Sequence, residues 1–126
     1  MALPRQHRLR GRRSLDRLHR RGRCFQSPLL TLRVALAEEA LLLPGDRAHT
    51  PSPWRCAVAI STKVSKRAVR RNRLRRLLHD HLRRCAPAPP HPRWLLVSLR
   101  PGAAEAGPPR LLEECSHLLR QAGLIP

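Results

Sequence analysis

The sequence predicts a single α+β domain in which three helices pack on one sheet. A length of 126 residues favours one domain. Helix-type and strand-type segments follow one another in the order helix, strands, helix, strand, helix, without internal repeats. The chain is 41% hydrophobic but only 2% aromatic, so its core must be built mainly from Leu, Val, Ile and Ala.

The first helix is expected between Ser14 and Gly22. Ser14 is a suitable N-cap, Leu15 and Leu18 are neighbours on one helical face, and Gly22 is a natural stop. The residues before this helix are rich in arginine and contain no acid. We therefore expect residues 1–13 to form a flexible basic arm.

Two strand candidates follow the first helix. One is expected over residues 25–38, with Pro28 near its start. The other covers residues 55–61, a short, apolar and partly β-branched run typical of a central buried strand. Residues 39–53 lie between them and are rich in proline in their second half, which predicts a loop.

The second half of the chain contains the clearest helix pattern, over residues 66–84. An apolar stripe recurs there at helical spacing: Leu74, Leu77, Leu78 and His81. Residues 86–93 form a proline-rich connector that cannot be helical. A last strand is expected over residues 94–99, and a last helix from near Pro109 to Gln121.

The charge balance indicates a polyanionic partner. The chain carries 26 Lys and Arg against 8 Asp and Glu, a formal net charge of +18. A compact domain with that excess repels itself, so nucleic acid is the first candidate partner and an anionic membrane surface is the second. No apolar run approaches the roughly 20 residues that a membrane helix needs. We expect no membrane association and a cytoplasmic location, although the arginine-rich start superficially resembles a transit peptide.

The remaining reactive residues form no recognisable catalytic or metal set. Four cysteines lie roughly thirty residues apart without a C-x-x-C pair, which disfavours a compact zinc site and favours reduced, buried thiols. The eight acids form no evident metal-binding set, and no His/Asp pairing suggests acid–base catalysis. A self-contained nuclease is therefore disfavoured.

The strongest functional signal is the basic run at the start of the 66–84 helix. Its polar face is expected to present Asn72, Arg73, Arg76, His79 and Arg83. Arginine forks bind phosphate oxygens, and Asn72 adds a neutral donor and acceptor. The alternatives are a solvated amphipathic face and a membrane-surface helix, but the leucine stripe is better used to cover the sheet. Seven of the eleven residues in this run are basic: Lys66, Arg67, Arg70, Arg71, Arg73, Arg75 and Arg76.

The segment from Ile60 to Leu77 resembles the signature of the bacterial ribonuclease P protein subunit. That family has a strand ending in a Ser/Lys segment, followed by a helix with an Arg-Asn-Arg motif and two more basic residues. Residues 9–22 and 94–102 extend the resemblance. It implies one mostly antiparallel four-stranded sheet with three helices, in the order αβββαβα. It also implies a ribosomal-protein-like fold with a left-handed βαβ crossover.

The resemblance further implies a function. In the family, the RNA subunit hydrolyses precursor tRNA with magnesium ions, while the protein binds that RNA and holds the 5′ leader between its sheet and first helix. The implied partners are the catalytic RNA and precursor tRNA, with no further protein required. The implied RNA-binding residues are Lys63, Lys66, Arg67, Arg70, Arg71, Asn72, Arg73, Arg75 and Arg76. The implied leader cleft contains Leu15, His19, Phe25 and Thr62.

Two departures concern the leader cleft. The family often has Phe where this chain has Leu15, and frequently an aromatic residue where it has His19. Leu15 cannot stack on an unpaired base, and core packing is the alternative role for both Leu15 and Phe25. A further departure is His79, at a position that is commonly basic in the family, because its charge depends on pH. The alternative function is a ribosomal or general RNA-binding protein of similar fold.

Overall fold

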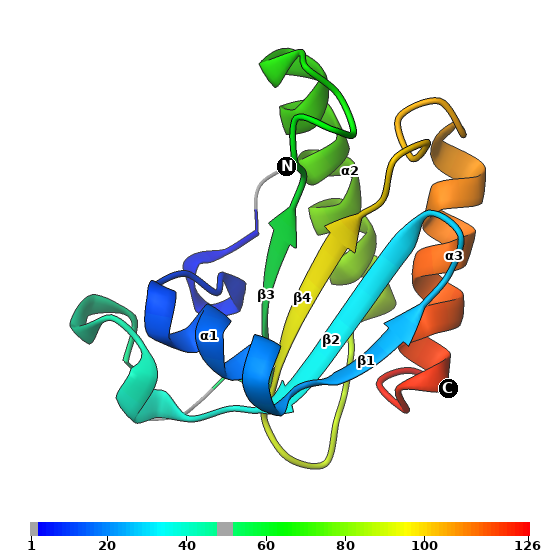
Figure 1. Cartoon of the computed structure of the whole chain (residues 1–126). Helices are drawn as coiled ribbons and strands as arrows, with labels where there is room; N and C mark the ends of the chain where they lie inside the picture. The colour runs from blue at the N-terminus through cyan, green and yellow to red at the C-terminus, as the bar shows by residue number, and fades with distance from the viewer. Residues whose placement is uncertain (1–2, 48–51) are drawn as a thin grey trace.

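Helices cover both faces of one four-stranded sheet with the spatial order β1-β2-β4-β3 (Figure 1). The computed structural model describes residues 3–47 and 52–126. The strands are β1 (Arg23–Gln26), β2 (Leu30–Leu36), β3 (Trp54–Ala59) and β4 (Arg93–Leu99). The helices are α1 (Arg12–Arg21), α2 (Ala68–Cys85) and α3 (Pro108–Gln121), with short 3-10 turns η1 (Arg5–His7), η2 (Glu39–Leu41) and η3 (Pro44–Asp46). The α+β class and the element order αβββαβα are confirmed.

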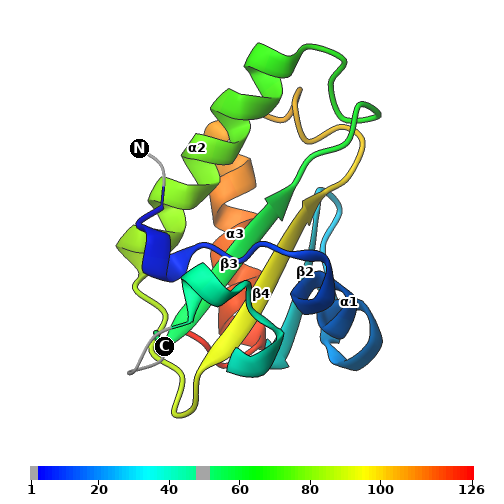
Figure 2. The same ribbon diagram turned by 90° about the vertical axis from the view of Figure 1, so that its left-hand side faces the viewer.

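The sheet is mixed, with two antiparallel pairings and one parallel pairing. Strand β2 is antiparallel to both β1 and β4, whereas β3 is parallel to β4. The parallel pair is joined by α2, which lies behind the sheet in the view of Figure 1 and on the side away from α1 in Figure 2. With β4 to the right of β3 in Figure 1, this crossover is left-handed, the rare hand for such a connection.

Alternation along the central strands divides the core between the two faces of the sheet. On the α2 and α3 side, β2 and β4 contribute Leu30, Leu32, Val34, Leu95, Val97 and Leu99. On the α1 side, Ala35, Trp94 and Leu96 pack with Leu18 of α1 and with Leu9 and Leu42. Alternate residues of each strand point to the α1 side of the sheet. The part of this face that α1 does not cover is therefore available to a ligand.

The single strand expected over residues 25–38 is a hairpin instead. β1 and β2 are separated by a turn at Ser27, whose backbone N–H donates to Leu30 O over 2.8 Å. The Glu114 carboxylate of α3 accepts hydrogen bonds from Ser27 Oγ (2.5 Å) and from the backbone N–H of Leu29 (2.9 Å). A side chain from the far end of the sequence therefore fixes the turn, which local propensity could not reveal.

From Leu3 onward, the segment before α1 is packed against the domain, which corrects the expectation of a flexible arm over residues 1–13; residues 1–2 of that arm lie outside the described part of the chain. Leu3 is fully buried in the main core, and the backbone N–H of Leu9 donates to Cys56 O over 3.0 Å. The segment passes along the β3 edge of the sheet on its way to α1 (Figure 2). Two apolar residues among the arginines anchor it, and α1 begins at Arg12, two residues earlier than expected.

The expected loop over residues 39–53 contains η2 and η3, and its residues 48–51 lie outside the described part of the chain. Asp46 at the end of η3 is buried, with only 2% of its side chain exposed. Arg10 donates to it from Nε (3.0 Å) and Nη2 (3.2 Å), and Arg5 donates from Nε over 3.4 Å. Hydrogen bonds and charge from Arg10, ahead of those from Arg5, hold the pKa of Asp46 below its usual value.

We expect Asp46→Asn to lower the melting temperature at pH 7 by about 4 °C, corresponding to ~1 kcal/mol for the loss of charge-assisted hydrogen bonds. Because the pKa of Asp46 is depressed in the folded state, its ionised form stabilises the fold above the unfolded value of roughly 4. This contribution is lost as the pH falls through the folded value. Thermal melts of both proteins between pH 3 and 7 should therefore converge at the acid end.

The matched control is Asp16→Asn, which removes the same charge. Asp16 is 53% exposed and lies 4.0 Å from Arg12, a geometry worth little in water. A loss at pH 7 that is equal for the two variants would contradict a specific role of Asp46.

All four cysteines are free, but they are not all buried as expected. Cys24 is exposed on β1 and Cys85 is half-buried, whereas Cys56 and Cys115 are buried. Burial raises the pKa of Cys115 to about 12, so this thiol stays protonated and behaves as a small apolar side chain. No helix among the described residues is both long and apolar enough to span a bilayer.

Candidate nucleic-acid interface

A rigid turn leads from β3 into α2 and presents the first basic side chains. Val64 is buried at its centre, and its backbone N–H donates to Ser61 O over 3.1 Å. Ser65 is also buried, and its Oγ accepts from the backbone N–H of Arg67 over 3.3 Å. Because this buried interior fixes the turn, the exposed side chains project from a defined surface: Thr62, Lys63, Lys66 and Arg67.

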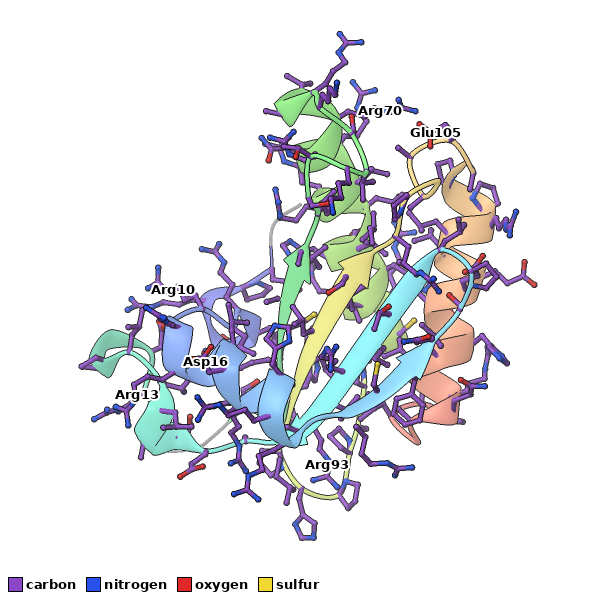
Figure 3. All side chains as sticks on the ribbon, in the orientation of Figure 1. Arg10, Arg13, Asp16, Arg70, Arg93 and Glu105 are labelled. Carbon is purple, nitrogen blue, oxygen red and sulfur yellow. The ribbon has the colours of Figure 1, made fainter. Side chains whose placement is uncertain are left out.

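Three of the motif arginines in the first half of α2 are engaged within the protein. Arg71 donates from Nη1 to Ser65 O (2.9 Å), and Arg70 donates from Nη2 to Ala104 O (2.7 Å). Arg70 also lies 4.0 Å from Glu105, at the upper end of the molecule in Figure 3. Arg75 donates to Asn72 Oδ1 (2.7 Å) and approaches Val58 O at 3.5 Å. These contacts tie α2 to the turn, to β3 and to the loop after β4.

The other basic side chains of the motif have no partner within the described part of the chain. This group consists of Lys63, Lys66, Arg67, Arg73 and Arg76. Arg73 and Arg76 line a hollow of about 310 Å³ together with Asn72 and Val69, which is 71% exposed. Asn72 Oδ1 already accepts from Arg75, which leaves chiefly the amide N–H groups of Asn72 for a ligand. This surface is therefore made of donors, which suits phosphate oxygens.

His79 does not extend this cationic surface. It is half-buried one turn after Arg75, and burial, followed by the positive charges of Arg75 and Arg8, lowers the pKa of His79 to about 4. The side chain is therefore neutral at physiological pH. The sequence analysis expected the charge of His79 to depend on pH, but His79 becomes protonated only below the physiological range.

A second candidate surface is the part of the sheet that α1 leaves uncovered. One row across this face carries Gln26, Thr31, Ser98 and Ala59, of which none is large and aliphatic. The neighbouring row contains Arg33 between Cys24 of β1 and Leu96 of β4. Arg33 is half-buried, and its side chain has no partner among the described residues. The Arg33 guanidinium group thus lies beside α1 on a part of the sheet that carries mostly short side chains.

Arg33 is a candidate residue that the sequence analysis missed. The alternation Leu30-Thr31-Leu32-Arg33-Val34 places Arg33 on the face opposite the leucines, so a period-two reading of the strand could have found it. The guanidinium of Arg33 is accessible because its neighbours are short. Which residues are its neighbours depends on strand pairing, and this pairing is visible only in the fold.

The structure does not bring the four expected leader-cleft residues together. Leu15 packs half-buried against the core under α1, and His19 is exposed one turn later on the same helix. Thr62 is exposed at the end of the open face, after β3. Phe25 points to the other side of the sheet and packs against the core that contains α3. Its position opposite Leu32 in the hairpin explains this orientation.

Comparison with known proteins identifies the family. The Ribonuclease P family model matches residues 3–123, nearly the whole chain. The chain belongs to the ribonuclease P protein family. The ribonuclease P protein component of Parasynechococcus marenigrum (strain WH8102) is 56% identical over 126 residues, covering 98% of each chain. That of Prochlorococcus marinus (strain MIT 9313) is 54% identical over 129 residues, covering 99% of each chain.

Solved ribonuclease P proteins share the fold at much lower identity. The Staphylococcus aureus RNase P protein superposes with a TM-score of 0.74 at 15% identity, covering 95% of this chain and 98% of that one. The Thermotoga maritima protein gives a TM-score of 0.70 at 20% identity, covering 90% and 96%. As a ribonuclease P protein, the chain is a component of a tRNA-processing ribonucleoprotein, and a general RNA-binding protein of similar fold is not favoured.

Proposed function

We propose that this ribonuclease P protein binds the catalytic RNA through α2 and the turn before it, and holds the 5′ leader of precursor tRNA on the open face of the sheet. The observation that carries the proposal is the division of the motif cations. Arg70, Arg71 and Arg75 are engaged by the protein, while Arg73 and Arg76 are held on the same rigid helix without a partner in the described structure.

The open face supports the second half of the proposal. A single-stranded leader needs a track that admits a backbone and offers a cation for its phosphates. Short side chains form such a track from Arg33 past Ser98 and Ala59 toward Thr62. Because this track leads to the turn before α2, a leader on it would lie next to RNA bound by the motif helix.

Catalysis itself is assigned to the RNA subunit, which would use magnesium ions. The described residues contain no group of three or more His, Cys, Asp or Glu side chains that could hold a metal ion. The role proposed for the protein is to bind and position RNA by neutralising phosphates. A cytoplasmic location and the lack of need for a further protein partner stay predictions.

The proposal is tested by cleavage of precursor tRNA at low magnesium concentration. We expect the catalytic RNA to cleave faster with the protein than without it, because the protein cations lower the repulsion between the two RNAs. We expect no cleavage by the protein alone. Cleavage by rigorously RNA-free protein, or the absence of stimulation at low magnesium, would contradict the proposed role.

A further inference from the structure

A second basic hollow lies at the end of the sheet opposite the start of α2. It has a volume of about 510 Å³ and is bordered by Arg17, Arg21, Arg23 and Arg93, with Phe25 and Leu36 in its apolar lining. Figure 3 shows Arg93 at the lower end of the sheet and Arg70 at the upper end. Strand β4 separates the two ends by about 20 Å, at roughly 3.3 Å per residue. The hollow is therefore distinct from the α2 surface.

The arginines of this hollow leave positive charge available to a ligand. Arg17 is fixed by a hydrogen bond from Nε to Leu36 O (3.0 Å) and an ion pair from Nη1 to Glu38 (2.8 Å). Within the described residues, the Arg93 side chain donates one long hydrogen bond, from Nη1 to His91 O at 3.4 Å. The side chain of Arg21 is exposed and has no partner in the described residues. Arg21 and Arg93 can thus donate to an anion without losing strong internal contacts.

The lining of the hollow also offers a platform for a planar group. The Arg23 guanidinium lies over the Phe25 ring, with its carbon 5.4 Å from the ring centroid. Phe25 is held from behind by the core, and Leu36 beside it is 52% exposed. Unpaired bases stack on aromatic rings and on guanidinium planes. A phosphate alone would use the cations but not this apolar floor.

We propose that this hollow binds an unpaired nucleotide of RNA, with the base against the Arg23–Phe25 pair and Leu36 and the phosphate on Arg21 and Arg93. Its volume lies within the range of small-ligand pockets. A nucleotide matches both features of the hollow, because its phosphate is an anion for the arginines and its base is a planar group for the apolar lining. The site extends RNA contact to a second end of the protein and does not depend on the role proposed for α2.

The test is a titration of the full chain with adenosine 5′-monophosphate, followed by NMR. Phe25 is the chain's only phenylalanine, so its ring signals report directly on this hollow. We expect saturable shifts of these signals, and a loss of affinity of about tenfold or more in Arg21→Ala/Arg93→Ala, because two charge-assisted contacts disappear. Inorganic phosphate should bind more weakly and shift the ring signals less.

The control pair Arg12→Ala/Arg84→Ala removes the same charge from two exposed ion pairs outside the hollow. It should retain the affinity within about twofold. If the alanine pair at the site fails to fold by its thermal melt, Arg21→Gln/Arg93→Gln replaces it. Unchanged Phe25 signals at saturating nucleotide, or equal losses in the two pairs, would overturn the proposal. The titration contains no catalytic RNA or precursor tRNA, so its failure is distinguishable from failure of the cleavage assay.

Discussion

Replacing Arg73 and Arg76 together with alanine is expected to weaken binding of the catalytic RNA by about 100-fold, or ~3 kcal/mol. Both side chains are exposed on a helix fixed by its apolar face, and neither has a partner among the described residues. Each is therefore free to make an ordered, charge-assisted bond to phosphate. Equilibrium binding at a fixed salt concentration measures the loss, and thermal melts should show little change in stability.

Two comparisons separate ordered contacts from diffuse charge. Arg12→Ala/Arg120→Ala removes the same two charges outside α2 and the turn before it, and should cost only a few-fold in affinity. Arg71→Ala removes a side chain that donates to Ser65 O, so we expect it mainly to lower the melting temperature. If the control pair weakens binding as much as the Arg73 and Arg76 pair does, net charge and not the motif helix explains the affinity.

Arg33→Ala is expected to weaken binding of precursor tRNA to the assembled holoenzyme by about tenfold, while mature tRNA changes by less than twofold. The half-buried guanidinium stands on the open face without a partner in the described structure, so its loss removes a contact to the leader alone. Stability should be unchanged or slightly higher, since an unpaired charge near the core is removed. Affinities of both tRNAs and a thermal melt of the variant measure these effects.

The matched control for Arg33 is Arg120→Ala on α3, on the other side of the sheet. Arg120 is exposed, and its Nε donates to Pro126 O over 3.3 Å. This variant should leave the preference for precursor over mature tRNA intact. An equal loss for both tRNAs in a folded Arg33→Ala protein would rule out a leader-specific role.

The sequence was sufficient to predict the elements whose pattern is local. The apolar stripe of residues 74–81 predicted a helix over 66–84, and α2 covers Ala68–Cys85. The runs at 55–61 and 94–99 predicted the buried strands found as β3 and β4. In these segments the buried residues follow the hydrophobic periodicity of the sequence, so the local pattern is enough to predict the element.

Elements that depend on distant contacts were not predictable in the same way. The hairpin between β1 and β2 is fixed by Glu114, more than eighty residues away in sequence. The segment before α1 is held by Arg55, a buried arginine that donates to Arg5 O and Arg8 O. A run of arginines in the sequence does not reveal which carbonyl groups will accept from them.

The same limit applies to the candidate site. The composition of the motif indicated RNA binding, but all of its arginines looked equivalent in sequence. Only the fold shows that Arg71 and Arg75 reach backbone carbonyls, while Arg73 and Arg76 reach none among the residues that the structure describes. Likewise, the strand register places Phe25 away from the open face and Arg33 on it.

The salt dependence of catalytic-RNA binding tests this division of the cations most directly. Each neutralised phosphate contributes roughly 0.7 to 0.9 to the slope of log affinity against log salt concentration. If Arg73 and Arg76 each neutralise one phosphate, Arg73→Ala/Arg76→Ala should reduce the magnitude of the slope by about 1.4 to 1.8. The Arg12→Ala/Arg120→Ala pair, which lies outside α2, should leave it nearly unchanged. An identical slope for the wild-type protein and the Arg73 and Arg76 variant would contradict the assignment of these two side chains to phosphate binding.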